Sequence, residues 1–93
     1  MRSRYTAFAV GDAEYLLASW HPDTRPVSID LDDEQRWLHL TIESSSGGGP
    51  FDTEGMVEFT AVYRTPDGRG RLHERSRFVR EDGRWLYVDG VVD

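Results

Sequence analysis

Glu74 is the residue of this sequence best placed to do chemistry. The residues at alternate positions of one predicted strand share a face of it: Leu72, Glu74, Ser76 and Phe78. Because that face is apolar at both ends, we expect it to pack beneath helices, with the carboxylate partly buried. An isolated charge in such a place costs several kcal/mol, so the carboxylate needs either a partner or a wet cavity.

Two roles for this carboxylate follow. The structural role is an ion pair between Glu74 and an arginine of the first predicted helix, Arg2 or Arg4. The functional role is a pocket carboxylate that acts as a general base or holds a ligand. Replacing Glu74 with alanine distinguishes the two roles. Breaking a buried ion pair costs about 3–5 kcal/mol of stability, whereas the loss of a pocket residue abolishes ligand binding.

His21 is the second candidate for proton transfer. It directly follows Trp20 at the end of the second predicted helix, where an imidazolium would complement the helix dipole. It is either a capping histidine or a general acid or base at the mouth of a pocket. The other two, His39 and His73, lie on predicted strands, and the three histidines show no spacing typical of metal ligands, so we expect no metal site.

Aromatic residues make up 12 % of the chain, and we expect them to form the core and to line a concave cavity with their polar ends. Together with the polar candidates, this gives the predicted ligand-binding residues: Tyr5, Trp20, His21, Glu74, Ser76 and Trp85. Cysteine is absent and all eleven basic residues are arginine, which excludes thiol nucleophiles, cysteine–zinc sites and lysine Schiff bases. We expect no cofactor.

The formal net charge of −6 argues against duplex nucleic acid or an anionic membrane as the main partner. Residues 64–84 nevertheless hold seven arginines against four acids. These arginines either pair with surface acids or form a face for an anion or an acidic partner. No stretch approaches the roughly 20 apolar residues of a membrane span, and no signal-peptide core is present, so we expect a cytoplasmic protein.

The positions of these residues depend on the predicted elements. Apolar spacing of three and four predicts helices over residues 2–10 and 12–20, separated by Gly11-Asp12. A connector with a short helical turn follows over residues 21–36, with acids at the start of the turn: Asp30, Asp32, Asp33 and Glu34. Alternation then predicts four strands: Leu38–Ile42, Val57–Tyr63, Leu72–Arg80 and Trp85–Val91.

The connections between the predicted strands are short. A flexible serine- and glycine-rich segment covers residues 44–52, and Pro66-Asp67-Gly68 and Asp82-Gly83 are turn sequences. The order is therefore two helices followed by a four-stranded meander. That order is typical of a single α+β domain with helices on one face of an antiparallel sheet.

Four segments resemble one family across nearly the whole chain. They are the opening Met1-Arg2-Ser3-Arg4-Tyr5-Thr6-Ala7-Phe8, the step Trp20-His21-Pro22, and the stretches His73–Phe78 and Gly83–Gly90. The chain resembles the YchJ-like family of bacterial proteins, and the resemblance implies an NTF2-like (cystatin-like) cone. Such a fold has N-terminal helices packed on a curved four-stranded antiparallel sheet. NTF2-like folds host enzymes as well as binding modules, so the fold alone does not decide the chemistry.

The sequence departs from the family in one respect. Family members carry cysteine-rich SEC-C zinc motifs beside this domain, and this chain has no cysteine, so zinc is not transferred to any residue here. Met1 is either the first residue of the protein or an internal methionine of a longer zinc-binding protein. We predict a non-catalytic module, a homodimer, that binds a small ligand or a protein partner. The alternative is a pocket enzyme of isomerase, dehydratase or hydrolase type that uses Glu74 with His21.

Overall fold

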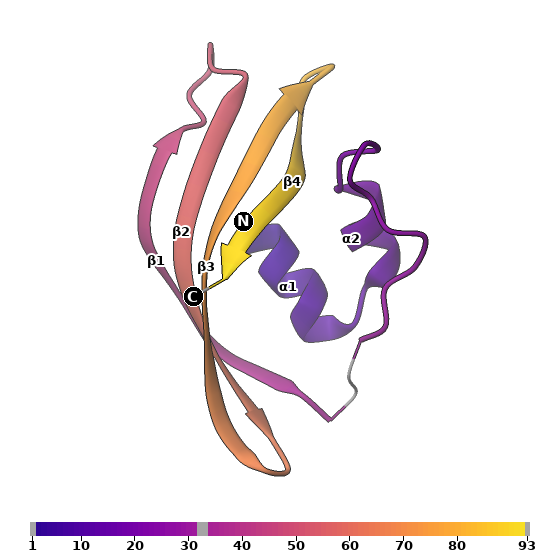
Figure 1. Ribbon diagram of the computed structural model, residues 1–93, viewed down its shortest axis with the longest axis vertical. Helices are drawn as coiled ribbons and strands as arrows, with labels where there is room; N and C mark the ends of the chain where they lie inside the picture. The colour runs from indigo at the N-terminus through magenta and orange to yellow at the C-terminus, as the bar shows by residue number, and fades with distance from the viewer. Residues whose placement is uncertain (1, 32–33, 93) are drawn as a thin grey trace.

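Two short helices precede a four-stranded antiparallel sheet in the computed structural model, which describes residues 2–31 and 34–92. The elements are α1 (Arg2–Val10), α2 (Ala13–Ala18), β1 (Arg36–Gly47), β2 (Glu54–Thr65), β3 (Gly68–Glu81) and β4 (Arg84–Val92). Each strand pairs with its neighbour in sequence. The sheet curves, and both helices lie on one of its faces (Figure 1), which confirms the predicted α+β class.

The break between the helices has the predicted chemistry. Gly11 has φ +77, a left-handed conformation that glycine adopts without strain, and it closes α1. Asp12 is the N-cap of α2, because its carboxylate accepts a hydrogen bond from the backbone N–H of Tyr15 at 3.1 Å. The two helices therefore meet at a fixed bend.

α2 is shorter than predicted, because the chain leaves it to join the sheet. Trp20 forms a parallel bridge with Tyr87 of β4. The backbone N–H of His21 donates to the carbonyl of Tyr87 at 2.7 Å, and the N–H of Tyr87 donates to the carbonyl of Ser19 at 2.8 Å. These bonds attach the end of α2 to the edge strand, and the chain leaves the helix after its C-cap residue Ser19.

The connector after α2 contains no helix among residues 21–31 and 34–35, and a single turn closes where the N–H of Thr24 donates to the His21 carbonyl at 3.1 Å. Of the acids expected to cap the turn, Asp32 and Asp33 lie outside the described residues. The connector instead bonds to the sheet: the Thr24 hydroxyl donates to the Val88 carbonyl of β4 at 2.7 Å.

β1 is longer than predicted, since residues 44–47 continue the strand instead of forming a flexible loop. Ser44 pairs with Glu58, and Gly47 pairs with Gly55. A ladder needs only backbone groups, so small polar residues can extend it where apolar alternation has ended. Gly47 also has φ +67, and a side chain there would clash with the Glu54 carbonyl.

The hairpin between β3 and β4 turns at Asp82 and Gly83, whose φ angles of 53° and 78° match the two left-handed residues of a type I′ turn. The β3–β4 register then shifts between the pairs Arg77–Asp89 and Phe78–Tyr87, which leaves Val88 as an extra residue of β4. Because of this bulge, Tyr87 faces the helices together with Phe78.

The core lies between the helices and the sheet, and the apolar residues buried there are Ala7, Leu16, Phe59, Ala61 and Phe78. Leu86 is also buried, but it pairs with Val79 on the opposite face of the sheet from Phe78. Phe78 is buried and Leu72 is half-buried, as the alternation along β3 predicted. The expected homodimer drew on large residues on both faces of the strands, Phe59 with Val62 and Trp85 with Leu86. Phe59 and Leu86 are buried within the single chain, and Val62 and Trp85 are half-buried.

Candidate functional site

The helices and the sheet enclose a cavity of about 120 Å³. Its lining residues come from α1, from the segment after α2 and from all four strands: Arg4, Tyr5, Phe8, Trp20, Trp37, Phe59, Ala61, Leu72, Glu74 and Tyr87. Six of these ten residues are aromatic, and only Arg4 and Glu74 carry a formal charge. The cavity is therefore an aromatic chamber with one cation and one anion.

Arg4 is buried on the inner side of α1, with only 4 % of its surface exposed. Its Nη1 donates to the Leu16 carbonyl at 3.0 Å and to the Ser19 hydroxyl at 2.7 Å. Its guanidinium carbon lies 5.2 Å from the ring centre of Trp20 and 4.4 Å from that of Tyr87. Burial lowers the pKa of Arg4 from its ordinary value, but arginine remains charged at any physiological pH.

Glu74 projects from β3 toward β4. Its Oε2 accepts a hydrogen bond from the Ser76 hydroxyl at 2.5 Å, and the carboxylate also shares one with the Tyr87 side chain. Gly90 of β4 makes room for it, since a methyl group there would collide with the carboxylate. Burial first, and then the negative charge of Glu74, raise the pKa of Tyr87 to about 12, so its hydroxyl stays protonated.

The predicted ion pair between Glu74 and an arginine of α1 is not present. Within residues 2–31 and 34–92, no ion pair joins Glu74 to Arg2 or Arg4. Two hydroxyls hold the carboxylate instead. Arg2 is exposed on the outer side of α1, and Arg4 acts on Glu74 through the cavity as a nearby positive charge.

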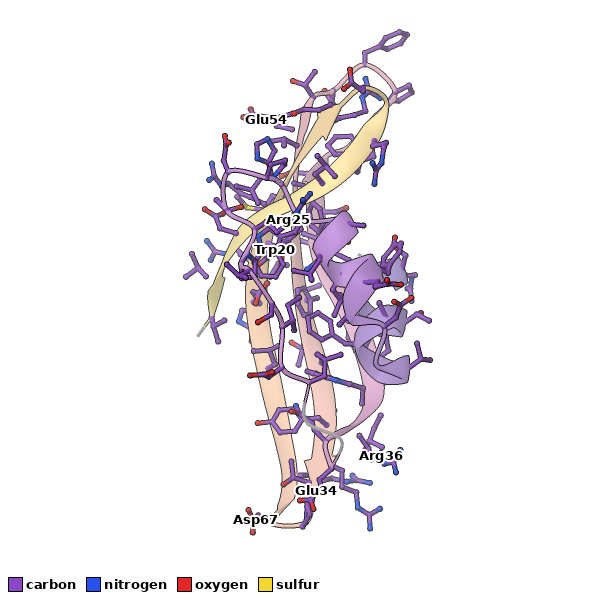
Figure 2. All side chains as sticks on the ribbon, turned by 90° about the vertical axis from the view of Figure 1, so that its right-hand side faces the viewer. Trp20, Arg25, Glu34, Arg36, Glu54 and Asp67 are labelled. Carbon is purple, nitrogen blue, oxygen red and sulfur yellow. The ribbon has the colours of Figure 1, made fainter. Side chains whose placement is uncertain are left out.

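The structure does not bring His21 to Glu74. The His21 Nε2 lies 2.5 Å from a carboxylate oxygen of Glu81, with Asp23 on the other side of the ring. Glu81 is seven residues beyond Glu74 on β3, about 23 Å along the strand. Adjacent residues of an extended segment point to opposite sides. Trp20 lines the cavity, so His21 points away from it; Figure 2 shows Trp20 beside β4.

The remaining predicted site residues divide between two places. Tyr5 and Trp20 line the cavity, and Ser76 is completely buried beneath Glu74. Trp85 lines a separate, wider groove of about 470 Å³ between the helices and the end of the sheet. Arg4 borders both spaces, and sequence reasoning had considered it only as a partner of Glu74.

Two arginines of the basic segment are paired on the surface. Arg77 donates two hydrogen bonds of 2.9 Å to the Asp89 carboxylate, and they lower the pKa of Asp89. Arg75 lies 3.8 Å from Glu58, which also contacts His73 at 2.7 Å. The interpretation that the basic segment pairs with surface acids thus holds for these two arginines.

Among residues 2–31 and 34–92, no group of three His, Cys, Asp or Glu side chains could hold a metal ion, and no helix is long and apolar enough to span a membrane.

A curved antiparallel sheet that closes over N-terminal helices around an internal cavity defines an NTF2-like domain. Residues 1–90 match the family described as YchJ, middle NTF2-like domain, and the chain belongs to this family. It is 56 % identical over 90 residues to a UPF0225 protein of Streptomyces coelicolor, a match covering 97 % of this chain and 69 % of that protein. A UPF0225 protein of Chromobacterium violaceum is 48 % identical over 95 residues, covering 99 % and 70 %.

Two solved structures share the fold. The solution structure of a SEC-C motif containing protein from Rhodopseudomonas palustris matches with a TM-score of 0.84 and 34 % identity, covering 100 % of this chain and 75 % of that one. The crystal structure of a SEC-C motif containing protein from Psychrobacter arcticus matches with a TM-score of 0.74 and 28 % identity, covering 100 % and 58 %. The resemblance to YchJ-like proteins and the NTF2-like fold are thereby confirmed.

Proposed function

We propose that this chain is a module that binds a small ligand in the cavity between its helices and its sheet, without catalysing a reaction. The aromatic lining with Arg4 and Glu74 on it is the observation that carries the proposal. Apolar walls with a few convergent polar groups are typical of ligand sites. The volume of about 120 Å³ is below the roughly 300–1,000 Å³ of drug-sized sites, so the ligand is small.

A purely binding role is favoured over the pocket enzyme because the cavity lacks a proton-transfer pair. Proton transfer requires acid and base within hydrogen-bond reach of the same substrate. His21 bonds to Glu81 outside the cavity, and the pKa of Tyr87 is about 12, too high for a base at neutral pH. Glu74 therefore has no partner for shuttling protons among the lining residues.

The three tryptophans provide the test. Trp20 and Trp37 line the cavity, whereas Trp85 lines the groove, so their indole N–H signals report on different places. We expect some members of a library of small neutral and charged organic molecules to shift the signals of Trp20 and Trp37 in two-dimensional NMR spectra. The Trp85 signal should stay in place. A library in which nothing moves the two cavity signals would overturn the proposal.

Two variants, each with leucine in place of an alanine, serve as controls for this experiment. Ala61→Leu adds a larger side chain to the wall of the cavity, whereas Ala9→Leu adds the same group at an exposed position of α1. Binding should be lost in the first variant and kept in the second. Equal binding by both variants would place the ligand elsewhere.

We also propose that two copies of the chain associate and that the protein works in the cytoplasm. The support for association is that several apolar residues of β1, β2 and β4 are exposed, and a second copy of the chain could cover them. These residues are Leu38, Met56, Val91 and Val92, with 38–69 % of their surface exposed. Light scattering at high micromolar concentration should give the mass of a dimer, and a monomer mass would contradict it.

Residues 1–93 are further proposed to form one NTF2-like domain that carries none of the SEC-C cysteines of the family. A protein partner is the other occupant compatible with a binding module. The NMR experiment separates the two, because a protein that docks on the outer surface leaves the cavity signals of Trp20 and Trp37 in place.

A further inference from the structure

Arg4 has hydrogen-bond donors that no protein group uses. Nη1 makes both of its hydrogen bonds, while Nη2 and Nε donate to no atom of the described residues. No completely buried polar side-chain atom of residues 2–31 and 34–92 lacks a partner. The two nitrogens therefore reach solvent-accessible space, which for a side chain 4 % exposed means the spaces that it lines. A guanidinium with free donors is a carboxylate-binding group.

Glu74 supplies the opposite charge in the same cavity. Ser76 and Tyr87 occupy two of the roughly four acceptor positions of its carboxylate, which leaves room for a cation. Because no ion pair joins it to Arg4, the two charges face the cavity without neutralising each other by contact. A purely anionic ligand would be repelled by Glu74 and a purely cationic one by Arg4. A ligand that carries both charges satisfies both.

The aromatic lining restricts the chemical class of the cationic group that the ligand can carry. A primary ammonium has three N–H donors to satisfy, and Glu74 is the one carboxylate among the lining residues. A quaternary, fully methylated ammonium has no N–H to donate and is attracted to the faces of aromatic rings. Trp37 packs edge-on or tilted against three rings, those of Tyr5, Phe8 and Tyr63, so its position in the wall is fixed.

We propose that the ligand is a small zwitterion with a methylated ammonium and a carboxylate, the chemistry of glycine betaine. This inference rests on the proposed small-ligand function. The carboxylate binds the free donors of Arg4, and the methylated ammonium lies among the aromatic rings near Glu74. The cavity of about 120 Å³ admits only a few non-hydrogen atoms, which excludes larger members of the class.

Three probes test the charge pattern, two of them of the same size and shape. They are glycine betaine, its isostere in which a tert-butyl group replaces the trimethylammonium, and tetramethylammonium. We expect glycine betaine to shift the indole signals of Trp20 and Trp37 at millimolar concentration and to bind about tenfold more tightly than either single-charge probe. Equal or tighter binding of the tert-butyl carboxylate would overturn the zwitterion and leave the small-ligand function standing.

Two glutamate variants complete the test. Glu74→Gln keeps the shape of the side chain but removes its charge, and it should cost about tenfold in affinity for glycine betaine while leaving the tert-butyl carboxylate unaffected or tighter. Glu14→Gln, at an exposed position of α2, should change neither affinity. If glycine betaine does not shift the signals of Trp20 and Trp37 while other library members do, the zwitterion inference is wrong and the small-ligand function stands. If no library member shifts these signals, the proposed function is wrong as well.

Discussion

The guanidinium carbon of Arg4 lies 4.4 Å from the ring centre of Tyr87, and the hydroxyl of the same tyrosine bonds to Glu74. One aromatic residue thus contacts both charged side chains of the cavity. Its ring face attracts the guanidinium, and its hydroxyl bonds to the carboxylate. Among residues 2–31 and 34–92 no contact ion pair joins Arg4 to Glu74, so each keeps part of its binding capacity for another molecule.

Arg4→Ala should lower the free energy of unfolding by about 3 kcal/mol, because two hydrogen bonds from a charged group and two cation–π contacts are lost. Arg2→Ala, on the exposed side of the same helix, should change it by less than about 0.5 kcal/mol. Urea unfolding followed by circular dichroism measures both. Equal effects would show that the burial of Arg4 contributes nothing.

Glu74→Ala should cost about 1–2 kcal/mol, less than the roughly 3–5 kcal/mol expected for a broken buried ion pair. The reason is that its removal leaves two hydroxyls without a partner, and no arginine loses a contact ion pair. A thermal melt compares the variant with wild type. A loss of 4 kcal/mol or more, on the order of a buried ion pair, would show that Arg4 depends directly on this carboxylate.

Tyr87 should make the stability fall at high pH. The folded pKa of about 12 lies above the value of about 10 in the unfolded chain. The folded state therefore holds this proton more tightly, and the resulting stability is complete below pH of about 10 and lost as the pH rises toward 12. Urea unfolding across that range measures it, and Tyr87→Phe should flatten the curve.

The same titration reports on Glu74. Removing its negative charge in Glu74→Gln should lower the pKa of Tyr87, since that charge is the second cause of the increase after burial. Tyrosinate absorbance follows the change directly. An unchanged Tyr87 titration in Glu74→Gln would mean that the carboxylate lies farther from the phenol than the structure places it.

Gly90→Ala should destabilise the fold by about 1–3 kcal/mol, because its new methyl group would lie on the Glu74 carboxylate. In the Glu74→Ala background the obstacle is gone, so the same substitution should cost much less. A double-mutant cycle measures this coupling. Additive effects would show that Gly90 serves the backbone of β4 and not the position of the glutamate.

The fold was predictable because its signals are local. The alternation along β3 and the turn sequence Asp82-Gly83 each specify their own segment, and both agree with the structure. Residues 44–47 were missed for the opposite reason, because the backbone of β2 recruits them into the sheet and their side chains carry no pattern. Sequence patterns report side-chain preferences, whereas ladders are built from the main chain.

The candidate site was predictable only in part. Glu74 was placed correctly on the inner face of β3 by alternation. Arg4 was undervalued, although it lies three and four residues before Ala7 and Phe8 on the inner stripe of α1, a spacing that places it on the same face. The orientation of His21 followed from the bridge between Trp20 and Tyr87, a contact between distant parts of the chain that no local pattern reveals.

The strand order β1-β2-β3-β4 has a consequence for how the molecule assembles. Each strand neighbours the one before it, so the sheet can zip up through successive hairpins with little loop-closure entropy to overcome. The bridge between Trp20 and Tyr87 joins distant parts of the chain, so forming it costs more loop-closure entropy than forming a hairpin does. We expect the helices to dock after the sheet has formed and to lift away first in local opening. Such opening would give a small ligand access to the chamber without a dedicated channel.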